Sequence, residues 1–249
     1  MATKKSKSKK IDSVSPLEIA TIAYGVRFTP LFGMMDKAGS IIDMILRTSG
    51  TPYGPKKFFS VRSNQVERAL VNDKTNEYLR FTDRDIILEL KINSRKLNDI
   101  YNHAVNFENF VLKPIHNLVK LDKIQRYGIL FKLSECNSQL VKTPIQHFLA
   151  PDIDNANSLS LSFTKKLPVL EAQVKKGVSD YRNVIYIAQQ SEKGEVTLSI
   201  DYQKYYIPPL EYEEFKEKPF PDFVDSGISY YKKNYISWLD KLINSTEVA

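Results

Sequence analysis

Ile22-Ala23-Tyr24-Gly25-Val26-Arg27-Phe28 is the first stretch of the chain with a regular hydrophobic pattern. Large apolar side chains alternate in it with small or charged ones, which is the period-two pattern of a strand with one buried face. An amphipathic helical pattern follows at 34–46, with apolar residues at three- and four-residue spacing. The same order recurs from Arg126, where a second alternating strand precedes a predicted short helix at 139–149. We therefore expect the chain to contain the same order of strands and helices twice, and we call each of these two sets a course.

The remainder of the first course is predicted from the same two periodicities. Residues 58–71 form an extended segment, 72–76 a polar turn, and 86–92 another alternating strand. A long amphipathic helix begins near Leu97 and ends near Leu118. Pro114 falls inside it and should kink the helix or break it near Leu112, because proline cannot donate the helical hydrogen bond.

The second course continues with a polar loop at 151–157 and with strands at 159–163, 170–174, 184–188 and 196–202. A turn at 191–194 joins the last two of these strands. After a charged loop at 208–221, a final helix carries an apolar stripe made of Val224, Ile228, Tyr231, Tyr235, Trp238, Leu239 and Leu242.

These patterns predict an α+β protein built from two β-α-β-β-α courses, with mainly antiparallel sheets that are each covered by helices. The expected layout is a first half at 16–122 and a second half at 123–249, after a basic arm at 1–15. That arm has too few apolar groups to offset the entropy of ordering, so it is predicted to be disordered. In an alternative arrangement, the first strand of the second course extends the first sheet and makes one continuous body.

The positive charge of the chain is concentrated in this arm. Five lysines lie in the first ten residues, and removing them from the formal net charge of +7 leaves +2 for the rest of the chain. These five are Lys4, Lys5, Lys7, Lys9 and Lys10. A protein whose folded body follows a nucleic-acid backbone usually keeps basic residues on its folded surface, so the near-neutral remainder argues against a dedicated groove.

Composition predicts a cytoplasmic location and no membrane span. No apolar run approaches the roughly 20 residues that a transmembrane helix requires, and no apolar region follows the lysine-rich start as it would in a secretory signal. The single cysteine, Cys136, permits no internal disulfide and fits a reducing compartment.

No catalytic or cofactor motif stands out, so we predict no cofactor and no metal. His103 and His116 have no Cys, Asp or Glu partner at ligand spacing, and His147 and Cys136 lie in no nucleophile signature. The chain lacks a phosphate-binding loop, a dinucleotide fingerprint and a nucleophile elbow. A third hypothesis is a hydrolase whose catalytic acids are Asp83, Asp85, Asp152 and Asp154. For both acidic pairs, however, the favoured interpretation is a solvated loop.

The strand Arg126-Tyr127-Gly128-Ile129-Leu130-Phe131 resembles the R-x-G-(L/I)-x-(Y/F) strand of a sporadically distributed bacterial family of uncharacterised proteins. In that family the strand likewise follows a long helix at mid-chain. Pro16-Leu17-Glu18 and Val26-Arg27-Phe28 are similar to the start of the family, and the helix at 223–238 resembles its aromatic-rich last helix. The family tends to carry Arg and Asn where this chain has Leu130 and Leu133. The resemblance implies a duplicated α+β fold in a bacterial or phage cytosol, and it implies no activity.

We expect a non-enzymatic cytosolic protein that binds another macromolecule, with a protein as the partner and a homodimer as one form of that binding. The alternative is a nucleic-acid-binding protein, whose basic arm holds phosphates and whose sheet aromatics stack on bases. Besides the arm lysines, the candidate contacts are Lys56, Lys57, Lys165, Lys166, Lys175 and Lys176. Gathering of these lysines on one face would favour nucleic acid.

Overall fold

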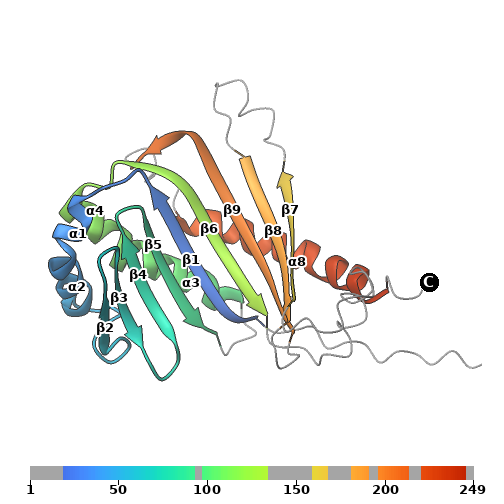
Figure 1. Ribbon diagram of the computed structural model, residues 1–249, viewed down its shortest axis with the longest axis horizontal. Coiled ribbons are helices and arrows are strands. Elements are labelled where there is room, and N and C mark those ends of the chain that lie inside the picture. Colours follow the sequence, from blue (N-terminus) through green and yellow to red (C-terminus); the bar gives the residue numbers. More distant parts are fainter. Residues whose placement is uncertain are drawn as a thin grey trace, which may run out of the picture.

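One antiparallel sheet forms the centre of the molecule in the computed structural model, which describes residues 19–92, 97–133, 159–167, 181–190, 196–212 and 220–244 (Figure 1). Within this part of the chain the sheet has nine strands in the order β2-β3-β4-β5-β1-β6-β9-β8-β7. The strands are β1 (Ile19–Phe28), β2 (Ser60–Ser63), β3 (Glu67–Asn72), β4 (Glu77–Thr82), β5 (Asp85–Lys91), β6 (Lys123–Leu133), β7 (Leu159–Leu167), β8 (Tyr181–Gln190) and β9 (Val196–Glu211).

The first strands of the two predicted halves, β1 and β6, pair with each other at the centre of this sheet. The prediction of an antiparallel α+β fold is confirmed, but the prediction of a separate sheet for each half is wrong. Alternation along β6 shows only which of its faces is buried. It does not show which strands lie beside its two edges, and β1 and β9 occupy both. The continuous body left open above is therefore the one found.

The helices are α1 (Gly33–Asp36), α2 (Ala38–Arg47), α3 (Leu97–Phe107), η1 (Glu108–Leu112), α4 (Lys113–Val119) and α8 (Phe220–Asn244). The segment η1 is a π-helix that ends at Leu112, two residues before Pro114. Because Pro114 has no N–H to donate, the regular hydrogen-bond ladder is interrupted there. The predicted disturbance near Leu112 is thus confirmed as a widened turn within a helical stretch that runs on to Val119.

Helices α3 and α8 pack on one face of the sheet, where the large alternating residues of β1 and β6 point. Tyr24 of β1 donates a hydrogen bond from its buried hydroxyl to the carbonyl of Ile100 in α3, at 2.8 Å. Its ring lies 6.1 Å from the rings of Phe107 and Phe220, and those two rings are 5.4 Å apart. The core is therefore an aromatic cluster held between the central strands and two helices from different halves of the chain.

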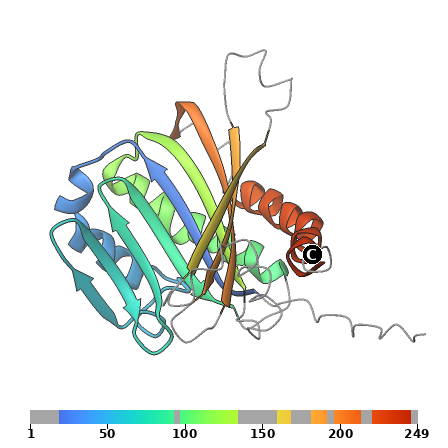
Figure 2. The same cartoon turned by 45° about the vertical axis from the view of Figure 1, so that its right-hand side comes forward.

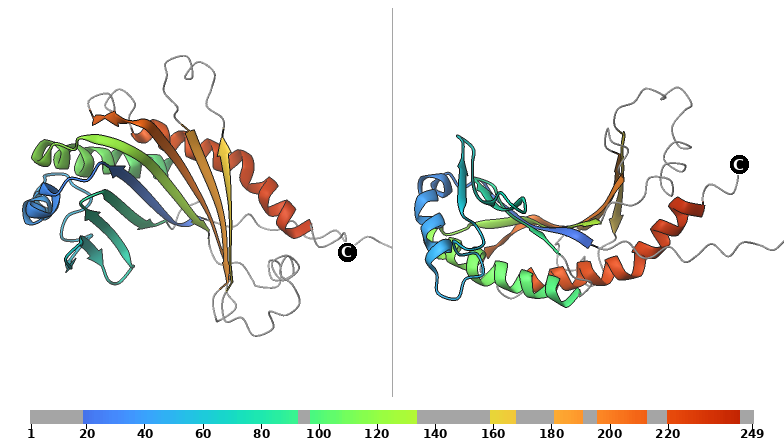
Figure 3. Two further views of the ribbon diagram at one scale, coloured as in Figure 1. Left: turned by 45° about the horizontal axis from the view of Figure 1, so that its top comes forward. Right: turned by 90° about the horizontal axis from the view of Figure 1, so that it is seen from below.

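The sheet is strongly curved, and its two ends bend toward the same side (Figure 2). Seen from below, the helices follow the convex side of the sheet, and the concave side faces away from them (Figure 3). None of the helices in the described ranges is long and apolar enough to cross a membrane.

Three parts of the sheet differ most from the sequence-based predictions. The extended segment at 58–71 is a hairpin of β2 and β3, and it turns where the Asn64 side chain accepts the backbone N–H groups of Val66 and Glu67. Strand β4 was missed, because only Leu79 and Phe81 give it an alternating apolar pattern and its buried Glu77 breaks that pattern. Strand β9 continues into the predicted charged loop as far as Glu211. The predictions for 1–15, 139–149, 151–157, 170–174 and 191–194 lie outside the described residues.

Gly227 sets how closely α8 approaches the sheet. A Cβ atom there would lie 2.9 Å from Cγ2 of Ile129 and 3.3 Å from Cδ1 of Tyr202. We expect Gly227→Ala to lower the free energy of unfolding by about 1–2 kcal/mol, because overpacking outweighs the gain in helix propensity. Thermal unfolding measures this change.

The matched control is Gly39→Ala in α2, where no atom lies within 4 Å of the added methyl. This variant should gain stability, by up to about 1 kcal/mol. Equal effects of the two substitutions would contradict the close approach of α8 to β6 and β9.

Candidate functional site

The concave face of the sheet is the candidate site, because no helix of the described residues covers it (Figure 3). Alternation places Ala23, Gly25 and Arg27 of β1 on this face, while the large residues between them point into the core. The same alternation applies to the neighbouring strands β5, β6 and β9. The chemistry of this face is therefore set by the small and polar residues of each strand pattern.

A hollow of about 280 Å³ lies over the two central strands. Its floor is formed by Gly25 and Gly128, which lie directly opposite each other in the β1–β6 register. The residues that surround the floor come from β1, β4, β5, β6 and β9, and their side chains include Arg27, Tyr78, Asp85, Ile87, Glu89, Arg126, Leu130, Lys132, Asp201 and Gln203. Both halves of the chain thus contribute to a single site.

The two glycines leave open space above the strands, and the backbone conformation does not require glycine at either position. Neither has a positive φ, so an ordinary residue could adopt the same backbone conformation. A Cβ on Gly25 would meet Ile87 at 3.9 Å, and one on Gly128 would meet Asp201 at 3.8 Å, both ordinary contacts. A glycine inside a strand weakens the strand and often marks a place where another molecule or backbone comes close. The pair therefore leaves room over the central strands for another group to come close to the backbone.

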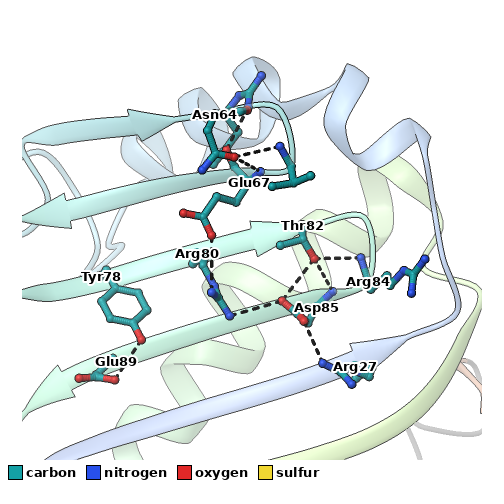
Figure 4. Close-up of polar contacts among 11 residues, drawn as sticks. Arg27, Asn64, Glu67, Tyr78, Arg80, Thr82, Arg84, Asp85 and Glu89 are labelled. Atoms are coloured by element: carbon teal, nitrogen blue, oxygen red, sulfur yellow. Dashed lines mark hydrogen bonds and ion pairs between the residues drawn. The ribbon is translucent and has the colours of Figure 1, made fainter.

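Two arginines lie side by side at one end of the hollow. Arg27 and Arg126 are direct cross-strand partners in β1 and β6, and like charges in that position repel each other. Arg27 donates to Asp85 at 3.3 Å, and Arg80 lies 3.9 Å from the other oxygen of the same carboxylate (Figure 4). Thr82 also donates to Asp85. One carboxylate thus serves two guanidinium groups.

Arg126 begins a directed chain of hydrogen bonds along β9. Its Nη1 donates to the Tyr205 hydroxyl at 3.1 Å, and that hydroxyl donates to the Gln203 side chain at 2.8 Å. The amide nitrogen of Gln203 then donates to Oδ2 of Asp201. Burial raises the pKa of the Asp201 carboxyl, although the bond from Gln203 and the charge of Arg126 both act to lower it. The chain holds these side chains in fixed orientations around the floor.

The other end of the hollow is closed by a pair of opposite charges. Lys132 donates to both oxygens of Glu89 at 3.0 Å, and the Tyr78 hydroxyl donates to Glu89 at 3.0 Å. Burial, together with the neighbouring Glu89 charge, raises the pKa of Tyr78 to about 12, so this hydroxyl remains protonated at neutral pH. This end is internally satisfied, in contrast to the arginine end.

A row of rings and cations continues from Arg126 across β9, β8 and β7. The guanidinium of Arg126 lies 5.6 Å from the ring of Tyr205, which stacks on Tyr181 at 4.7 Å with an interplanar angle of 4°. The ammonium of Lys166 lies 4.4 Å from the Tyr181 ring. Because the four strands are consecutive in the sheet, each ring lies between two neighbours of the row. Both of its faces are therefore occupied.

The described lysines that the sequence singled out do not gather on one face. Lys56 is exposed in the loop before β2, and Lys57 forms an ion pair with Glu77 at 2.6 Å. Lys165 and Lys166 point to opposite faces of β7, at the other end of the sheet. Lys4, Lys5, Lys7, Lys9, Lys10, Lys175 and Lys176 lie outside the described residues.

The acids of the hydrolase hypothesis are only partly located. Asp85 lines the hollow, whereas Asp83 lies 3.6 Å from Arg84 and is not part of the lining. Asp152 and Asp154 lie outside the described residues, as do His147 and Cys136. Within the described ranges, no three His, Cys, Asp or Glu side chains form a group suited to a metal ion.

The site was not predicted from the sequence, although the two central strands that build it were. Gly25-Val26-Arg27 in β1 and Arg126-Tyr127-Gly128 in β6 have the same pattern in opposite directions. Antiparallel pairing of these two triplets necessarily places glycine opposite glycine and arginine opposite arginine. This mirrored pattern was the available signal. Asp201 and Gln203 had no comparable signal in the sequence.

Comparison with known proteins does not place the chain in a family: no family model matches it, and no curated protein does. Among solved structures, Methanococcus jannaschii TBP is similar at 11% sequence identity, over 74% of this chain and 87% of that one, with a TM-score of 0.26. At so low a TM-score, the likeness says nothing about what this chain binds.

The space over the floor can be tested by filling it. We expect Gly25→Ala and Gly128→Ala each to raise the free energy of unfolding by about 0.5–1 kcal/mol, because alanine loses less conformational entropy in a strand and meets no clash here. Chemical denaturation measures both variants. A loss of stability in either would show that the backbone itself requires glycine there.

Asp201 should make stability depend on pH. Because its folded pKa is raised, the folded state binds the proton more tightly than the unfolded state, so stability falls as the pH rises from the unfolded pKa through the folded pKa. We expect Asp201→Asn to remove this loss. As the pH rises above about 4, the melting temperature of the variant should therefore increase relative to that of the wild type. A difference that does not change with pH would contradict the raised pKa.

Proposed function

We propose that this is a non-enzymatic binding protein, which holds a protein partner on the concave face of its sheet. The observation that carries the proposal is a hollow on a helix-free face with a balanced set of charges. Three cationic side chains (Arg27, Arg126 and Lys132) and three acidic ones (Asp85, Glu89 and Asp201) line it. Mixed charges of this kind suit the alternating donors and acceptors of a peptide chain.

The same features argue against nucleic acid as the partner. A surface that follows a phosphate backbone is predominantly basic, whereas these walls carry a carboxylate for every cation. Base stacking also needs free aromatic faces. The rings of Tyr181 and Tyr205 lie between each other and the cations of Lys166 and Arg126, so a base would have to displace one of these contacts.

We also infer that the two halves repeat one structural unit, with β1 and β6 as equivalent strands. Going outward from this pair, the last strand of each half comes next, β5 on one side and β9 on the other. The preceding strands then follow in reverse order of sequence on both sides. The single cysteine, which permits no internal disulfide, supports a cytosolic setting for this protein.

The test is a selection of displayed peptides on the full-length protein, followed by affinity measurements on variants. We expect the selected peptides to bind the wild type and to lose at least tenfold in affinity on Gly25→Val, which fills the hollow with a side chain that suits a strand. Gly39→Ala, on helix α2, which contributes no residue to the hollow, is the control and should bind like the wild type.

A parallel titration addresses nucleic acid. Fluorescent single- and double-stranded DNA and RNA are titrated with the full-length protein over a series of salt concentrations. Binding through the arm alone would be weak, would fade with salt and would be unchanged in Arg126→Gln. Binding that persists at moderate salt and is lost in Arg126→Gln would contradict a protein partner on this face.

A further inference from the structure

We propose that the hollow over Gly25 and Gly128 receives the carboxylate of an acidic peptide segment, with Arg126 and Arg27 as its anion-binding groups. This inference rests on the proposed function and specifies the chemistry of the segment that is bound. It follows from the arginine end of the hollow, from the free acceptor on Asp201 and from the charges of the walls.

Arg126 is oriented but forms no ion pair in the described part of the chain, where no carboxylate oxygen lies within 4.0 Å of it, and the Asp201 carboxylate acts on it only from a longer distance. The Tyr205 hydroxyl accepts a hydrogen bond from one nitrogen of Arg126 at 3.1 Å, and the centre of the Tyr205 ring lies 5.6 Å from its guanidinium carbon. A guanidinium held in this way loses little freedom when it forms a two-pronged contact with an anion. Arg126 is therefore pre-organised for a ligand that carries a negative charge.

The neighbouring Arg27 adds a second positive charge that favours the binding of an anion. Arg27 lies directly opposite Arg126, and its own partner Asp85 is shared with Arg80. The guanidinium group of Arg80 in turn also contacts Glu67, at 3.5 Å (Figure 4). An anion between Arg27 and Arg126 would reduce their mutual repulsion, which the folded protein alone leaves only partly compensated.

The acids of the walls favour a carboxylate over a phosphate. Asp85, Glu89 and Asp201 all line the same small hollow. A phosphate monoester carries about −1.5 to −2 charges near neutral pH, so it would meet stronger repulsion from these groups than a carboxylate with a single charge. A carboxylate also matches the planar fork of arginine with two parallel hydrogen bonds.

Asp201 indicates that the ligand also donates hydrogen bonds. Gln203 donates to Oδ2 of Asp201, while no described residue donates to Oδ1. That oxygen lies beside the floor, 3.8 Å from the position of a Cβ on Gly128. A backbone N–H of an extended peptide can donate a hydrogen bond to this oxygen. The hollow thus combines an anion site with a nearby acceptor, and an acidic residue within a peptide offers both a carboxylate and N–H groups.

The experiment is an NMR titration of the full-length protein, with arginine side-chain and glycine amide signals observed. The probes are N-acetyl-glutamate N-methylamide, the corresponding capped glutamine, capped O-phosphoserine, an acetylated dipeptide with a free C-terminus, and inorganic phosphate. We expect the capped glutamate to shift the signals of Arg126 and Gly128, and the capped glutamine to bind at least tenfold more weakly. The free C-terminus tests whether a terminal carboxylate serves as well as a side chain.

Two variants locate the effect. Arg126→Gln should lower the affinity for capped glutamate at least tenfold. Arg62→Gln should leave it unchanged, because Arg62 lies on β2 in an ion pair with Asp73, away from the hollow. Equal binding of capped glutamate and capped glutamine, tighter binding of phosphoserine or phosphate, or no shift at Arg126 and Gly128 would each overturn the inference.

Failure of this inference is distinguishable from failure of the proposed function. If selected peptides bind the hollow but contain no acidic residue that their affinity requires, the protein-binding function stands and the carboxylate site is wrong. If nucleic acid binds through Arg126 at moderate salt and no peptide does, the proposed function itself is wrong.

Discussion

The pairing of β1 with β6 is the contact on which the rest of this molecule depends. It joins strands from the two halves of the chain, and it continues one sheet from β2 to β7. On the convex side it brings Tyr24 and Tyr127 against the same phenylalanine of α8, Phe220. On the concave side it brings Gly25 opposite Gly128. The aromatic core and the hollow are thus two faces of a single pairing.

The two faces have been built under opposite constraints. The convex side is filled with large side chains and covered by α3 and α8, which buries apolar area and stabilises the fold. The concave side keeps two glycines opposite each other in the central β1–β6 pairing, at a cost of about 0.5–1 kcal/mol each relative to alanine. It also sets two arginines side by side. Features that weaken a strand, gathered at one place, are what a binding site requires and what a purely structural face would avoid.

Sequence reasoning recovered the elements whose buried face is long and regular. Strands β1, β5 and β6 alternate over several residues, and the disturbance at Pro114 follows from its missing N–H. Strand β4 was not predicted, because two apolar residues are too few to define a period-two pattern. The joining of both halves into a single sheet was not predicted, because alternation identifies the faces of a strand and not the strands that pair with its edges. The duplication remains a prediction, and so does the basic arm.

The candidate site could be recognised only after the pairing was known. Its residues are the small and polar members of each alternating strand, which sequence analysis treats as the solvent side. The lysines selected for charge alone proved scattered where they are described. Asp201 and Gln203 join Arg126 only because β9 lies beside β6, and this adjacency is a property of the fold rather than of any local motif.

Amide hydrogen exchange of the native protein tests most directly whether the site belongs to one cooperative body. The amides of β1 and β6, with those of the adjacent β5 and β9, should exchange most slowly and with one shared free energy of opening, equal to that of global unfolding. If the amides of β1 and β5 opened with a different free energy from those of β6 and β9, the halves would be independent units. A hollow built jointly from both halves would then be untenable.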